Sequence, residues 1–136
     1  MEIRMPEGWV ELRHPSLRAE LLQFLKELDD PTYQQAAWIE RSVDRHLIQG
    51  IDPVYAFLYD FTDLGTDPEG EVSYTLFDQE GVTAIRALTQ LLDSILDELG
   101  NAKTERFIRH PLWPRVVEQA NLAFTLLERR GLPIYT

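Results

Sequence analysis

The sequence predicts a single all-α domain of five or six helices over residues 1–136. Three observations favour this fold class. Apolar residues recur at spacings of three and four, Asp-Pro pairs and glycines fall where helices would begin and end, and apolar residues make up 44% of the chain against 26% charged residues. This composition is typical of a folded globular protein, and a chain of this length can bury its own core.

The first expected helix covers residues 15–29. Leucine and phenylalanine recur along it at helical spacing, and it begins at Pro15 or Ser16. The Asp29-Asp30-Pro31 segment should end this helix. A second helix over about 31–47 should follow at once, because Asp30 can cap a helix whose first position is proline.

Asp52 and Pro53 repeat this cap-and-proline pattern before a third expected helix over residues 53–62. Its buried side should carry four apolar residues, Val54, Phe57, Leu58 and Phe61. A buried strand over 54–61 remains an alternative, since a short apolar run suits both structures. Residues 62–70 should form a loop, and one short extended segment is expected near residues 71–77.

The clearest helix is expected over residues 79–99, where an apolar stripe runs through five turns. Asp78 is its expected N-cap, and Gly100 supplies the left-handed stop. A short helical turn is expected within residues 101–110. The last helix should cover about 112–130 and end at Gly131-Leu132-Pro133.

Negative charge is concentrated in the middle of the chain. The formal net charge is −10, and no Lys or Arg occurs in the 40 residues between Arg45 and Arg86, which include eight acidic residues. Such a block repels nucleic acid and anionic lipid and attracts basic partners. We therefore expect neither nucleic-acid nor membrane binding.

Part of this block has a structural explanation, because Asp52 and Asp78 suit helix caps and Glu80 suits a first helical turn. Five acids, Asp60, Asp63, Asp67, Glu69 and Glu71, are left without an expected structural role. Tyr55 and Tyr59 should share one side of the third helix, away from its buried face. Tyrosines beside acids are typical of a protein-binding surface, so the expected partner-binding residues are Asp52, Tyr55, Tyr59, Asp60, Asp63, Asp67, Glu69 and Glu71.

The sequence contains only weak motifs for metal binding or catalysis. Residues 60–71 place Gly65 and Glu71 at the sixth and twelfth positions of a calcium-binding loop, but Thr62 and Leu64 occupy two ligand positions. The chain has no cysteine, and its histidines stand in no helical metal-binding pair. We expect no metal, no cofactor and no catalytic residue.

Several short motifs resemble a family of small, acidic, uncharacterised bacterial proteins over about residues 21–128. The resemblance rests on Leu28-Asp29-Asp30-Pro31-Thr32-Tyr33-Gln34-Gln35 with Trp38, Phe57-Leu58-Tyr59-Asp60 with Thr62, Leu64 through Asp67-Pro68, Leu99-Gly100, and Pro111-Leu112-Trp113 leading to Val116-Val117. It implies no assigned chemistry. It carries a loose association with immunity to toxins.

Together, these features favour a cytoplasmic, non-enzymatic module whose acidic surface docks on a basic protein partner. An immunity or antitoxin protein that covers a toxin is the sharpest form of this hypothesis. Two alternatives remain open. One is a small-ligand-binding protein or enzyme with a pocket lined by Asp60, Asp63 and His46, and the other is a homodimeric structural protein.

Overall fold

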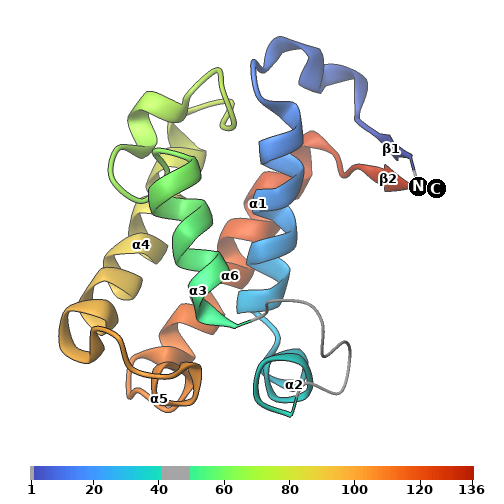
Figure 1. Cartoon of the computed structure of the whole chain (residues 1–136). Coiled ribbons are helices and arrows are strands. Elements are labelled where there is room, and N and C mark those ends of the chain that lie inside the picture. The colour runs from blue at the N-terminus through green and yellow to red at the C-terminus, as the bar shows by residue number, and fades with distance from the viewer. Residues whose placement is uncertain (1, 41–49) are drawn as a thin grey trace.

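A computed structural model describes residues 2–40 and 50–136 and confirms the all-α fold class (Figure 1). The α-helices are α1 (Pro15–Leu28), α2 (Pro31–Tyr33), α3 (Ile51–Tyr55), α4 (Gln79–Leu99), α5 (Thr104–Ile108) and α6 (Trp113–Leu127). Two π-helical segments continue α2 and α3, namely η2 (Gln34–Ile39) and η3 (Ala56–Phe61). The 3-10 segments are η1 (Glu7–Glu11), η4 (Pro68–Glu71) and η5 (Glu128–Arg130), and the strands are β1 (Ile3–Arg4) and β2 (Ile134–Tyr135).

Helix α6 lies at the centre of the fold and packs against both α4 and α1 (Figure 1). Its inner face includes Ala120 and Ala123, which are fully buried and whose small side chains let neighbouring helices approach closely. The facing side of α4 buries Ile85, Leu88, Leu92 and Ile95. The core therefore lies along the seams that α6 shares with its two neighbours.

The bounds of α4 match the expected helix. The Asp78 side chain accepts a hydrogen bond from the Gly81 backbone N–H at 3.1 Å, and Gly100 ends the helix with φ of 55°. Both end signals act as predicted: Asp78 pairs a backbone N–H that the helix leaves unpaired, and Gly100 adopts a positive φ that favours glycine.

The start of the second expected helix is confirmed as well. Asp30 accepts a hydrogen bond from the Tyr33 backbone N–H at 3.0 Å, with Pro31 in the first turn. Buried Gln34 then donates to the carbonyls of Glu27 and Leu28 and accepts from the Trp113 indole N–H at 3.0 Å. One side chain thus joins the end of α1, η2 and the start of α6. The remainder of this expected helix, with His46, lies outside the described residues.

Two local expectations are corrected, and one further feature was not expected. Asp52 lies in the first turn of α3 and is not its cap, because Gly50 precedes the helix and the Ile51 N–H donates to the Thr104 hydroxyl at 3.3 Å. Residues 71–77 form a tight turn closed by the single Val72–Leu76 bridge. The antiparallel pairing of β1 with β2, which holds the two chain ends together in Figure 1, was not expected.

Candidate functional site

The third expected helix is confirmed as α3 and η3, which carry or immediately precede most of the expected site residues. Asp60, Asp63, Asp67 and Glu69 are exposed at the end of η3 and in the loop and η4 that follow. Asp52 is also exposed, but it lies at the other end of the helix, about 12 Å away along the axis. The structure therefore groups the loop acids and leaves Asp52 apart.

The loop that carries these acids is held by backbone hydrogen bonds. The Asp67 N–H donates to the Asp63 carbonyl at 2.7 Å, and the Gly65 N–H donates to the Leu58 carbonyl at 2.9 Å. Leu64 is fully buried beneath the loop, and the Thr62 hydroxyl donates to the Phe57 carbonyl at 2.9 Å. The acids are thus displayed from a fixed backbone, which lowers the entropic cost of binding a partner.

Glu71 differs from the other loop acids and corrects the expectation that it has no structural role. Its side chain is buried, and its two carboxylate oxygens accept hydrogen bonds from the Asp63 backbone N–H and the Thr75 hydroxyl, both at 2.8 Å. Glu71 therefore joins the acidic loop, residues 62–70, to the turn that follows it. Asp67 also has a local role, since it accepts a hydrogen bond from the Gly70 N–H at 3.3 Å.

Glu69 forms an exposed ion pair with Arg86 at 3.1 Å. By contrast, the side chains of Asp52, Asp60 and Asp63 make no hydrogen bond or ion pair with any residue that the structure describes. Asp60 and Asp63 are therefore the loop acids whose carboxylates are free for an external partner.

The two tyrosines are turned toward α4. Their rings stack with centroids 5.7 Å apart, the Tyr55 hydroxyl donates to the Leu92 carbonyl at 2.7 Å, and the Tyr59 hydroxyl donates to the Asp93 carboxylate. Burial raises the pKa of both hydroxyls well above the usual tyrosine range, and the nearby Asp93 raises them further. Because their hydroxyls are already bonded, the half-buried tyrosines hold α3 and η3 against α4.

Phe61 is an exposed aromatic residue that the sequence pattern missed. Helical spacing placed it on the buried face, yet it is 72% exposed. The reason is the π-helical segment: its wider turn rotates the last residues relative to an α-helix, so Phe61 leaves the stripe that Val54 and Leu58 continue to bury. An exposed aromatic side chain stands between Asp60 and Asp63 in the sequence as a result.

Two acids of α4 lie near the tyrosines. Asp93 is half-buried against Tyr59, and Asp97 is exposed one turn further along the helix. Asp93 and Asp97 could have been found from the sequence, because a spacing of four residues places both on one face of the helix. We call the set Asp60, Phe61 and Asp63 the acidic face.

The described residues give no geometric support to the alternative of a pocket lined by Asp60 and Asp63. Three pockets formed by residues 2–40 and 50–136 are lined by neither Asp60 nor Asp63. Within the same residues, no group of three or more histidines or acids is placed to hold a metal ion. Buried His110 contacts Glu98 at 2.8 Å and accepts from the Leu112 N–H, which fixes the start of α6.

No helix in the described part of the chain is both long and apolar enough to cross a membrane. Comparison with curated proteins and with solved structures yields no match. A family model described as a domain of unknown function, DUF7945, matches residues 12–132. This match spans the helical core and the acidic loop, and it confirms the resemblance to an uncharacterised family. The chain belongs to the DUF7945 family.

Proposed function

We propose that this chain is a non-enzymatic protein-binding module whose acidic face docks on a basic protein. The observation that carries the proposal is the grouping of two unpaired carboxylates, Asp60 and Asp63, with exposed Phe61 at the end of a helix fixed to α4. Protein interfaces use aromatic side chains for affinity and charged side chains for orientation, and this segment offers both within four residues.

The charge of the chain supports a basic partner over other classes. Residues 47–100 contain eleven acids and one base, Arg86, which is already paired with Glu69. A surface of this kind speeds the arrival of a cationic protein by roughly ten- to a thousandfold at low salt, and it repels phosphate backbones. It also selects against acidic proteins, because like charges that face each other across an interface cost several kcal/mol.

In its sharpest form, the proposal makes this chain an immunity protein in the cytoplasm of a bacterium, where it covers the cationic active site of a nuclease-like toxin. The small size and high negative charge of the chain support this form, since neutralising a toxin requires fast association. The resemblance to small acidic bacterial proteins points the same way.

Affinity capture from the host, followed by binding measurements on the purified partner, tests the proposal. The chain should retain a basic protein at low salt and release it at high salt. The Asp60→Lys and Asp63→Lys double variant should associate at least about tenfold more slowly. The Glu20→Lys and Glu118→Lys double variant is the matched control, because both residues are exposed, form no ion pair within residues 2–40 and 50–136, and change the net charge equally.

Phe61→Ala tests the apolar anchor separately. This residue is exposed, so its removal should leave folding unchanged while weakening binding by about thirtyfold, the usual effect of a central aromatic contact. If the double lysine variant and Phe61→Ala both bind like the unaltered chain, the acidic face is not the docking surface. A homodimer would instead appear in light scattering as a dimer mass that falls as salt rises.

A further inference from the structure

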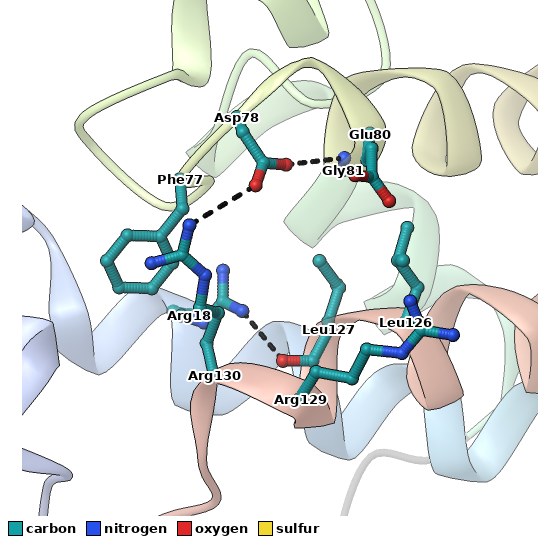
Figure 2. Close-up of a pocket in the computed structure, with 9 residues that line it drawn as sticks. All are labelled: Arg18, Phe77, Asp78, Glu80, Gly81, Leu126, Leu127, Arg129 and Arg130. Atoms are coloured by element: carbon teal, nitrogen blue, oxygen red, sulfur yellow. Dashed lines mark hydrogen bonds and ion pairs between the residues drawn. The ribbon is translucent and has the colours of Figure 1, made fainter.

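A second feature of the molecule lies outside the acidic face. A pocket of about 210 Å³ opens where the start of α4, the end of α6 and α1 meet (Figure 2). Figure 2 shows Leu127 between Arg18 on one side and Arg129 on the other. The pocket is lined by Arg18, Phe77, Asp78, Glu80, Gly81, Leu126, Leu127, Arg129 and Arg130.

Arg18 is the unusual member of this lining. It is only 1% exposed, and its guanidinium donates to two backbone carbonyls, those of Thr75 and Leu127, each at 2.9 Å. Its Nε is buried without a hydrogen-bond partner, and no carboxylate of the described residues lies within ion-pair distance of the guanidinium. The guanidinium also lies over the rings of Trp9 and Phe77, 5.2 and 4.7 Å from their centroids. These contacts offset part of the cost of burying the cation, but no anion neutralises it.

The neighbouring charged side chains do not provide Arg18 with an anionic partner. Arg130 pairs with Asp78 at 3.4 Å, and the other oxygen of Asp78 accepts from the Gly81 N–H, so both oxygens of that carboxylate are engaged. Exposed Arg129 forms no ion pair with any described residue. Three arginines and two carboxylates leave the lining with one excess positive charge, on a chain whose net charge is −10.

The pKa of Arg18 reflects the same environment. Burial lowers it to about 10, nearby Arg130 lowers it too, and Asp78 acts in the opposite direction. A guanidinium stays protonated at neutral pH under these conditions, so the pocket keeps its positive charge.

We propose that this pocket binds the carboxylate of a small organic acid. One excess positive charge suits a singly charged anion, and the two acids in the lining disfavour a doubly charged phosphate. Arginine guanidinium groups match the geometry of a carboxylate, and the side chains of Leu126 and Leu127 offer contact to a short hydrocarbon tail, whereas the Phe77 ring is already covered by Arg18 and Arg130.

Calorimetry and NMR titration of the full chain with butyrate test the proposal. Butyrate should bind saturably at millimolar concentration and shift the resonances of residues around the pocket, while inorganic phosphate and chloride should bind more weakly. Arg129→Gln should weaken butyrate binding by about tenfold, the effect of losing one charged hydrogen bond. Arg115→Gln is the matched control, because it removes an exposed arginine of α6 that forms no ion pair with the described residues and does not line the pocket.

Arg18→Met should abolish binding if the variant folds. If it does not fold, the proposal is tested by comparing the butyrate affinities of Arg129→Gln and Arg115→Gln. Absence of saturable binding, equal affinity in these two variants, or tighter binding of phosphate than of butyrate would overturn the proposal. The Asp60→Lys and Asp63→Lys variant should bind butyrate normally, so this test does not depend on the acidic face.

Discussion

Replacing Glu71 should weaken the fold by an amount that depends on what takes its place. Glu71 is 6% exposed, and its carboxylate accepts from the Asp63 N–H and the Thr75 hydroxyl at 2.8 Å each. In Glu71→Ala, both donors lose their partner. In Glu71→Gln, the amide oxygen can still accept from Asp63, and the amide nitrogen can donate to the rotated hydroxyl of Thr75.

The structure sets the size of each effect. Thr75 is fully buried, so its hydroxyl would remain unsatisfied at a cost of about 2 kcal/mol, whereas Asp63 is exposed and water can replace its partner at about 1 kcal/mol. We therefore expect Glu71→Ala to lower the free energy of unfolding by about 3 kcal/mol. Glu71→Gln should lower it by about 1 kcal/mol, because the hydrogen bonds persist without the charge.

Urea unfolding monitored by circular dichroism measures both values. Glu69→Ala is the control, since Glu69 sits two residues away in an exposed ion pair and should change stability by less than about 0.5 kcal/mol. Equal losses for Glu71→Ala and Glu69→Ala would refute the claim that Glu71 holds the acidic loop in place.

Three further predictions concern the packing around the site. Gln34→Ala should cost about 3 kcal/mol in urea unfolding, because it removes the partner of the Trp113 indole and of two helix-end carbonyls, and a loss below about 1 kcal/mol would contradict this role. Gly65→Ala should lower Tm, since a Cβ there would lie 2.5 Å from the Tyr59 ring, and an unchanged Tm would show that the ring can move freely. The raised pKa of Tyr59 means that the folded state keeps a proton which the unfolded state loses, so stability should fall as pH rises above about 10. Tyr59→Phe should make this fall shallower in unfolding curves recorded between about pH 8 and pH 11, and an identical pH profile would argue against the buried hydroxyl.

Local signals were sufficient to predict most of the helices. The ends of α4 follow from Asp78 and Gly100, whose effects act within a few residues. Contacts between distant segments gave no such signal, which is why the pairing of β1 with β2 and the link from Gln34 to Trp113 emerged only from the structure. The sequence contains both members of each pair, but no local pattern shows that they lie close together in the fold.

The candidate site was predictable in the same way. The exposed acids Asp60 and Asp63 follow from charge counting and helix position. Phe61 and Glu71 do not, because a π-helical turn exposes the first and a loop hydrogen-bond pair buries the second. Charge alone predicts a solvated carboxylate, and it cannot distinguish a loop acid with two buried donors from one with none.

The central claim, that the acidic face is a docking surface for a basic protein, is tested most directly by association rates at two salt concentrations. For the partner obtained by capture, the unaltered chain and the Glu20→Lys and Glu118→Lys control should associate at similar rates. The Asp60→Lys and Asp63→Lys variant should be slower by at least about tenfold at low salt, and high salt should narrow the difference. Equal rates for the two double variants at low salt would contradict the account, because the location of the charge would then have no effect.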